Sequence, residues 1–264
     1  MSLNPFADTV NTANEQIETD SDRLGGSFVW DGGAYLVTIL AAYAGKAKSG
    51  ARSMNFEVQD ATGRKHKFTE YVTTGDAKGN KPYYERDGKK SYLPGFNNVN
   101  AICLFTAKKE LNALTFETKI LKLRDFEQKK DVPTEVPMAV ELIGKQFILG
   151  LEKHEVNVTK KFGNEYKAVS KVDQPTVPDT KFENQIGKIF FADNKCTIAE
   201  LREAKQAGTA PTAGFYDKWV EANTGKIINK VKTEGLVPPP GAGASGPAGT
   251  PTDAGGAEVD SLFD

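Results

Sequence analysis

Alternation of apolar and polar residues dominates positions 28–172 and predicts a mainly β chain. In residues 54–59 every second side chain is apolar, and a second alternating segment follows at residues 65–73. A period of two places successive side chains on opposite faces of a strand, so one face of each segment is predicted to be buried. Residues 34–43 are rich in β-branched and aromatic side chains, which also favour strands.

Turn residues predict two hairpins and one longer strand. Asp87-Gly88 lies at the centre of residues 83–92, and an Asp-Gly pair suits a two-residue turn that needs positive φ. Residues 155–172 are interpreted as a second hairpin. Residues 138–151 are interpreted as one long strand, whose two glycines supply the bends that a small barrel requires.

Helical spacing is confined to three short segments. Apolar residues recur at helical intervals in 96–104, and Thr197 with Glu200 forms a capping-box pattern before a predicted helix at 198–207. Residues 214–233 place aromatic and aliphatic side chains along one helix face. Short strands with few helices favour a β-barrel of the oligonucleotide-binding (OB) type or of the SH3 type, decorated by helical insertions and C-terminal helices.

Composition divides the chain into three parts. Residues 1–27 are predicted to be an N-terminal extension, residues 28–235 the domain of the predicted OB-type or SH3-type barrel, and residues 236–264 a disordered linker with an acidic tail. The linker begins with three prolines and continues in small residues, which bury too little apolar surface to offset the entropy of ordering. The 264 residues have a net charge of −1, but all 34 Lys and Arg residues precede the linker. The folded part is therefore basic, which suggests a polyanionic partner.

The sequence gives little support for a membrane protein, a secreted protein or an enzyme. No apolar run approaches the ~18–20 residues that cross a bilayer, and the N-terminus lacks the features of a secretory signal. Cys103 and Cys196 form no CxxC pair, which fits a reduced cytoplasmic setting. His66 and His154 lack zinc-site spacing, and the GxGxxG match at 241–246 follows prolines instead of a strand. We expect no catalytic residues, metal, cofactor or small-molecule substrate.

Basic and aromatic side chains are interleaved in the predicted hairpins and in the loop at 46–52. Cations follow a phosphate backbone, and aromatic rings stack on unpaired bases for about 1–3 kcal/mol each without reading their identity. This mixture predicts a surface that binds a single-stranded nucleic acid. The predicted phosphate contacts are Lys46, Lys48, Arg52, Arg64, Lys65, Lys67, Arg86, Lys89, Lys90, Lys160 and Lys161. The predicted stacking rings are Tyr71, Tyr83, Tyr84, Tyr92, Phe162 and Tyr166.

Two segments resemble the single-stranded DNA-binding proteins of tailed bacteriophages. Residues 83–99, with the run DGKKSYLPGF at 87–96, are similar to the hairpin-to-helix segment of that family. Residues 260–264, DSLFD, are similar to the acidic, Phe-terminated tails of bacterial and phage proteins of this kind, with the difference that Asp264 follows Phe263 here. The resemblance implies an OB fold without enzymatic activity that coats single strands in DNA replication, recombination and repair, in the cytoplasm of the host bacterium. It also implies that replication or recombination proteins bind the tail through Asp260, Leu262, Phe263 and Asp264.

Three other functions stay open at this point. An RNA-binding or double-strand-binding OB protein uses the same cations and rings as one that binds single-stranded DNA. A metal-dependent nuclease needs carboxylates at ligand spacing, and no such cluster stands out among the plentiful Asp and Glu residues. A structural adaptor that binds only protein does not require rings interleaved with cations.

Overall fold

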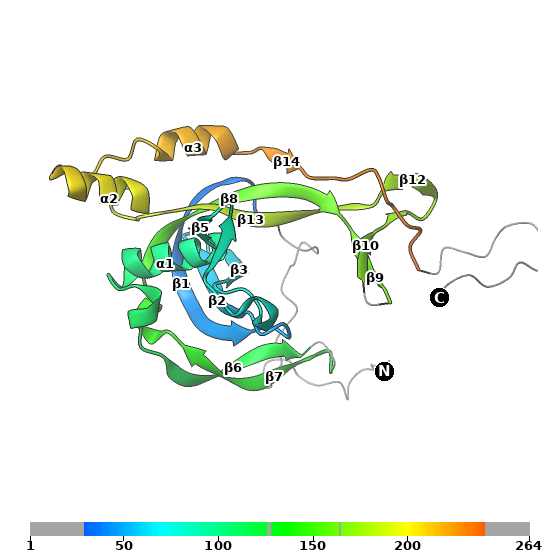
Figure 1. Cartoon of the computed structure of the whole chain (residues 1–264), viewed down its shortest axis with the longest axis horizontal. Helices are drawn as coiled ribbons and strands as arrows, with labels where there is room; N and C mark the ends of the chain where they lie inside the picture. Colours follow the sequence, from blue (N-terminus) through cyan, green and yellow to red (C-terminus); the bar gives the residue numbers. More distant parts are fainter. Residues whose placement is uncertain (1–28, 126–127, 164, 241–264) are drawn as a thin grey trace, which may run out of the picture.

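The computed structural model describes residues 29–125, 128–163 and 165–240. Strands dominate this part, so the prediction of a mainly β chain is confirmed (Figure 1). The predicted N-terminal extension lies outside the described residues, as does the predicted tail from residue 241 onward. The α-helices are α1 (Pro94–Thr106), α2 (Ile198–Ala207) and α3 (Tyr216–Asn223), and the 3-10 turns are η1 (Asp76–Lys78), η2 (Leu111–Ala113) and η3 (Val140–Leu142). The strands are β1 (Gly33–Lys46), β2 (Arg52–Asp60), β3 (Lys65–Tyr71), β4 (Tyr83–Arg86), β5 (Lys89–Tyr92), β6 (Glu117–Asp125), β7 (Lys130–Met138), β8 (Gln146–Asn157), β9 (Thr159–Phe162), β10 (Glu165–Ala168), β11 (Ser170–Lys171), β12 (Gln174–Pro178), β13 (Thr180–Phe190) and β14 (Ile227–Asn229).

The main sheet runs in the order β13-β8-β1-β2-β3, with each of these strands antiparallel to its neighbours. β14 adds to β8 in parallel, and the β6–β7 hairpin joins β1 through the pair Tyr43 and Met138. Among the described residues, β3 and β13 do not pair with each other. The barrel predicted from the sequence is therefore not closed. Helix α1 contacts both of these strands, and an edge covered by a helix needs no strand partner.

The inner face of the sheet is apolar because its alternating segments pair in register. Phe56 of β2 lies opposite Phe68 of β3, and their rings stack with centroids 5.0 Å apart. Val99, Ile102 and Cys103 of α1 are buried in the same core. Each aliphatic side chain buried in this way stabilises a fold by about 1.5–3 kcal/mol. These contacts hold α1 against the sheet, and burial raises the pKa of the Cys103 thiol to about 12.

The predicted strand at 138–151 is wrong in its first half, whereas residues 146–151 belong to a strand. β7 ends at Met138, η3 follows, and β8 begins only at Gln146. Gly144 adopts φ +75, a conformation that suits glycine, and its N–H donates a hydrogen bond to the carbonyl of Ile39. The chain therefore turns at the glycine instead of bending gently within one strand.

The predicted helix at 214–233 is also wrong in its second half. Helix α3 ends at Asn223, and Gly225 follows with φ +67. β14 then pairs in parallel with β8, so backbone hydrogen bonds to the sheet replace the last helical turns. Apolar spacing alone predicts a helix face that continues through this segment, but such spacing does not distinguish a helix from a short strand after a glycine.

Local cap and turn signals are confirmed. Asp87 and Gly88 both have positive φ, as the predicted two-residue turn between β4 and β5 requires. Thr197 caps α2: its hydroxyl accepts a hydrogen bond from the Glu200 N–H, and the Glu200 carboxylate accepts one from the Thr197 N–H at 2.8 Å. The predicted hairpin within 155–172 is the β9–β10 pair.

Glu141 ties η3 to the segment that leads into β6. Its carboxylate accepts a hydrogen bond from Lys109 Nζ at 2.7 Å and another from the N–H of Thr115 at 3.0 Å. These contacts lower the pKa of Glu141 from 4.5 to about 2. A carboxyl group with a depressed pKa stabilises the fold above its unfolded pKa, and this contribution is lost as the pH falls through the folded value.

We expect Glu141→Gln to lower the free energy of unfolding at neutral pH, and we expect that cost to shrink between pH 4.5 and about 2. Urea unfolding at pH 7 and pH 3 measures it. Glu203→Gln is the control, because Glu203 is an exposed residue of α2. An equal cost at both pH values would assign the effect to the lost hydrogen bonds and not to the charge of Glu141.

Candidate nucleic-acid interface

The basic loop between β1 and β2 lies beside the segment that leads to the β4–β5 hairpin. The N–H of Asp76 donates a hydrogen bond to the carbonyl of Ser49 at 2.8 Å. Gly50 has φ +82, and a Cβ at this position would overlap the Asp76 carboxylate, so the two segments fit closely. The predicted cations of this loop are exposed and form no ion pair with any described residue: Lys46, Lys48 and Arg52.

β3 presents predicted site residues on the outward face of the sheet. Lys65, Lys67 and Tyr71 are exposed, whereas the alternate side chains of β3, at positions 66, 68 and 70, are half-buried. The Tyr71 side chain is 52% exposed. Lys65 Nζ and Lys67 Nζ both approach the carboxylate of Glu57 on β2, at 3.4 Å and 3.0 Å. One carboxylate therefore offsets part of the positive charge of two predicted phosphate contacts.

Arg64 has partners within the fold. Its guanidinium pairs with the Asp60 carboxylate at 2.7 Å and lies 4.9 Å from the ring centroid of Trp30. Although burial opposes the charge of Asp60, hydrogen bonds from Thr62 and Arg64 keep the pKa of this carboxyl group below its usual value. Arg64 lies in the β2–β3 turn, at the opposite end of β2 from Arg52. The guanidinium of Arg64 is therefore bound to Asp60 and to the Trp30 ring and is not free for a phosphate.

The β4–β5 hairpin divides its predicted contacts between two faces. Tyr83 lies opposite Tyr92 and Glu85 lies opposite Lys90, so these four side chains share one face. Lys90 Nζ is 5.2 Å from the ring centroid of Tyr83, within the range of a cation–π contact. Tyrosines adjacent in the sequence therefore do not form one continuous surface. The opposite face carries Tyr84, Lys89 and Arg86, and Arg86 lies 3.6 Å from Asp87.

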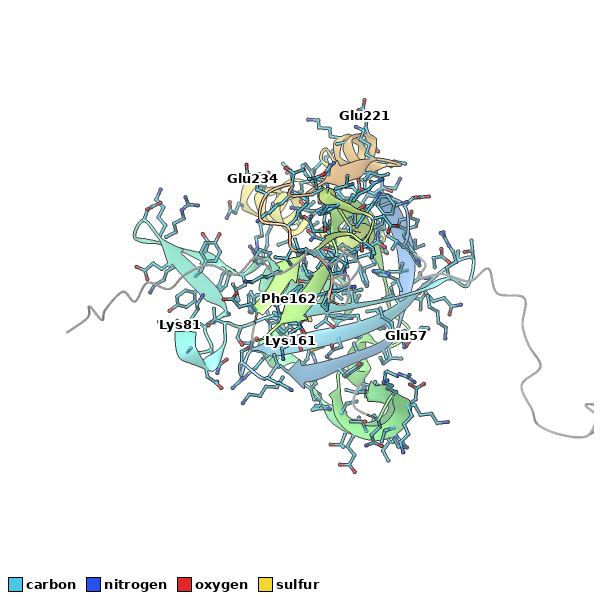
Figure 2. All side chains as sticks on the ribbon, turned by 90° about the vertical axis from the view of Figure 1, so that its right-hand side faces the viewer. Glu57, Lys81, Lys161, Phe162, Glu221 and Glu234 are labelled. Atoms are coloured by element: carbon cyan, nitrogen blue, oxygen red, sulfur yellow. The ribbon has the colours of Figure 1, made fainter. Side chains whose placement is uncertain are left out.

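The β9–β10 hairpin lies in the connection between the end of β8 and the start of β13 (Figure 1). Tyr166 lies opposite Lys161 on this hairpin and is 71% exposed. In Figure 2, Lys161 and Phe162 lie near the centre of the face turned toward the viewer. Phe162 is half-buried, and neither Lys160 nor Lys161 has an acidic partner in the described part of the chain. The hairpin thus offers a free ring beside free cations.

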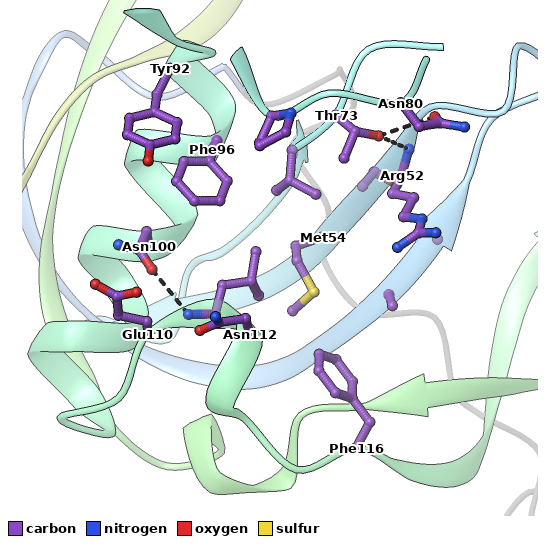
Figure 3. Close-up of a pocket in the computed structure, with 16 residues that line it drawn as sticks. Arg52, Met54, Thr73, Asn80, Tyr92, Phe96, Asn100, Glu110, Asn112 and Phe116 are labelled. Atoms are coloured by element: carbon purple, nitrogen blue, oxygen red, sulfur yellow. Dashed lines mark hydrogen bonds between the residues drawn. The ribbon is translucent and has the colours of Figure 1, made fainter. Parts of the chain in front are cut away.

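A cavity of about 600 Å³ lies where the ends of β1 and β2 meet α1 and the β4–β5 hairpin (Figure 3). Tyr92 of β5 and Phe96 of α1 stack along one side, with ring centroids 4.8 Å apart and planes 23° from parallel. Phe116 lines the cavity from the segment before β6, across from these rings in Figure 3. Arg52 lies at its edge. The fold therefore brings two predicted site residues, Arg52 and Tyr92, to one cavity.

Most of the cavity lining was missed in the sequence. Phe96 and Asn100 follow Tyr92 at intervals of four residues, which places them on one side of α1, and this spacing was a usable signal. Asn112 and Phe116 reach the cavity through η2 and the chain that follows it. No sequence pattern marks these two positions.

The two histidines of the chain, His66 and His154, lie in the core or beside it. Burial lowers the pKa of His66, whose ring centroid is 5.4 Å from that of Trp30. His154 is buried, with Nε2 2.8 Å from a Glu152 carboxylate oxygen. Within the described ranges, no three His, Cys, Asp or Glu side chains are placed to hold a metal ion. No helix in the same ranges is long and apolar enough to cross a membrane.

No protein-family model matches the chain, and no curated protein matches it either. Its function must be inferred from the arrangement of its own residues.

Proposed function

We propose that the protein binds single-stranded DNA without reading its sequence. The proposed DNA-binding surface is the outward face of β2 and β3 together with the loops and hairpins around that face. The observation that carries the proposal is the arrangement of exposed rings beside cations that lack acidic partners. Tyr71 lies on β3, Lys46 ends β1, Lys48 lies in the β1–β2 loop, and Lys161 and Tyr166 lie on the β9–β10 hairpin.

The strand order supports an OB-type fold for this domain. An OB fold is a five-stranded, partly open barrel that binds oligonucleotides on strands 2 and 3 and on two loops, one between strands 1 and 2 and one between strands 4 and 5. If β8 and β13 are the fourth and fifth strands, these loops are residues 47–51 and 158–179. The basic loop and the β9–β10 hairpin occupy these two positions.

The side chains available suit an unpaired strand better than a duplex. Cations attract the phosphates of either form, but a flat ring gains a stacking contact only from a base whose face is free. Because every base has such a face, stacking does not select a sequence. Tyr71 and Tyr166 are both largely exposed and are available for this contact.

In this proposal the protein coats single strands during DNA replication, recombination and repair, as the resemblance to phage single-stranded DNA-binding proteins implies. Residues 260–264, which lie outside the described residues, recruit replication or recombination proteins. No chemical step is assigned to the protein.

We expect Tyr166→Ala to weaken the binding of oligo-dT by roughly tenfold, because a base stacked on an aromatic ring contributes about 1–3 kcal/mol. Because the Tyr166 side chain is exposed, its removal leaves the hydrophobic core intact. Phe215→Ala is the matched control: Phe215 is 41% exposed and directly precedes α3, which lies away from the β9–β10 hairpin (Figure 1). Fluorescence anisotropy with labelled oligo-dT of graded length gives both affinities.

The wild-type protein tests the proposal first. No binding of oligo-dT at low salt, or a preference for duplex DNA, would refute it. Tighter binding of oligo-U than of oligo-dT would favour RNA as the partner. Cleavage of labelled DNA in the presence of Mg²⁺ would show an enzyme in place of a binding protein.

A further inference from the structure

We propose that the cavity beside α1 receives one unstacked base of the bound strand, while Arg52 holds an adjacent phosphate. This inference deepens the proposed function and rests on it. It assigns a base-binding role to Phe96, Phe116, Asn100 and Asn112.

The walls of the cavity suit a flat aromatic ligand. Tyr92 and Phe96 are nearly parallel and present a stacked pair on one side, and Tyr92 remains 55% exposed. Phe116, 37% exposed, lies across from them in Figure 3, so that an inserted base has aromatic surface on two sides. Small-molecule sites usually occupy about 300–1,000 Å³. The volume of about 600 Å³ therefore admits a base together with its sugar.

Polar groups without partners at one end of the cavity are available for hydrogen bonds with the edge of a base. Asn100 Oδ1 accepts a hydrogen bond from the N–H of Leu111 at 3.0 Å, which leaves the Asn100 amide hydrogens without a partner among the described residues. The Asn112 amide makes no hydrogen bond within the same residues. An amide side chain both donates and accepts, so it can pair with the edge of any base.

The charges at the two ends orient the nucleotide. Glu110 lines the cavity near Asn100 and Asn112, and its carboxylate repels phosphate from that end (Figure 3). Arg52 lies at the other side of the cavity, and its backbone N–H donates to Thr73 Oγ1 at 2.9 Å. The Arg52 guanidinium makes no hydrogen bond or ion pair within the described part of the chain. It is therefore free to bind a phosphate.

The position of the cavity suits a bound strand. Arg52 follows directly on the β1–β2 loop, which contains the exposed Lys48, and the exposed Lys46 ends β1 on the other side of this loop. A strand lying along that loop would place its phosphates on cations and turn one base into the cavity. The site would thus anchor the strand at one end of the interface.

The test uses the full chain and oligo-dT that carries 5-iodo-deoxyuridine, which cross-links under near-ultraviolet light to an aromatic side chain stacked on it. Mass spectrometry identifies the cross-linked peptide. We expect cross-links in the segments that contain Tyr92, Phe96 and Phe116. We also expect Phe116→Leu to weaken oligo-dT binding by about five- to tenfold, whereas Phe215→Leu, which changes a ring of similar exposure, leaves affinity unchanged.

Tyr92→Leu is the second variant, since it changes the most exposed of these three rings, and circular dichroism checks that each variant folds. Tyr92→Leu is expected to remove the cross-link at position 92 and to leave those at Phe96 and Phe116. If the wild-type protein binds oligo-dT but cross-links only outside the cavity, and Phe116→Leu and Tyr92→Leu bind as tightly as the wild type, the cavity inference is wrong while the proposed function stands. If the wild-type protein does not bind oligo-dT at all, the proposed function itself fails.

Discussion

The affinity for oligo-dT is expected to fall about three-thousandfold when the salt concentration rises tenfold. Binding to a single strand releases about 0.7 counterion per phosphate contact, so five contacts give a slope of about −3.5 in a plot of log K against log salt. The structure leaves enough free cations for five contacts. The predicted phosphate contacts without an acidic partner in the described residues are Lys46, Lys48, Arg52, Lys89, Lys90, Lys160 and Lys161.

Removal of individual lysines tests which of them contact phosphates. Lys160→Ala combined with Lys161→Ala should reduce the magnitude of the slope by about 1.4. The matched control removes two lysines from the surface helices, Lys205 on α2 and Lys218 on α3, and should leave the slope unchanged. These controls preserve the change in net charge, so they separate local contacts from a general effect of charge. A slope near zero for the wild-type protein would remove the electrostatic part of the proposal.

The second large effect concerns stability: Trp219→Ala is expected to lower the free energy of unfolding by about 3–5 kcal/mol. Trp219 of α3 is buried against Phe190 of β13, with ring centroids 5.7 Å apart. The ring also lies over two glycines of the sheet. A Cβ at Gly150 or Gly187 would approach it to 2.8 Å or 2.9 Å, so the ring fills the space that those glycines leave. Urea denaturation measures the loss.

A double-mutant cycle sharpens this test. Gly150→Ala alone should cost about 1–3 kcal/mol because its Cβ meets the Trp219 ring and the Lys188 carbonyl. Part of that cost should disappear in the Trp219→Ala background, since the ring is then absent. Glu221→Ala is the control on the exposed side of α3, at the top of Figure 2, and should change stability by less than about 0.5 kcal/mol. Unchanged stability of Trp219→Ala would show that α3 does not pack on this sheet in solution.

Short-range sequence signals predicted the local structure correctly. The Asp87-Gly88 turn and the Thr197 cap depend on backbone conformations that a few neighbouring residues decide. The alternation in 54–59 and 65–73 likewise predicted which faces of β2 and β3 are buried. Where a glycine turned the chain, at Gly144 and Gly225, apolar spacing alone misplaced the element boundaries.

The candidate interface was only partly visible in the sequence. The predicted tyrosines are exposed or half-buried, as a stacking surface requires. The sequence did not reveal that Lys65 and Lys67 share Glu57, that Arg64 is held by Asp60, or that adjacent tyrosines lie on opposite faces of a hairpin. The contacts of Lys65 and Lys67 with Glu57 depend on the register of the β2–β3 hairpin, and the Arg64–Asp60 pair depends on the conformation of its turn. The opposite faces of Tyr83 and Tyr84 follow from the two-residue period of a strand.

The sequence by itself determined that this chain is mainly β, that its basic residues precede the linker, and that its hairpins mix rings with cations. These properties follow from side-chain chemistry and from the two-residue period of a strand, which need no knowledge of distant contacts. Only the tertiary structure decided that the sheet stays open with α1 against both edge strands, that α3 packs over glycines, and that Arg52, Tyr92 and Phe116 meet at one cavity. These contacts form when the chain buries its apolar faces in a common core. That packing brings together residues that are far apart in the sequence, and no local pattern predicts their contact.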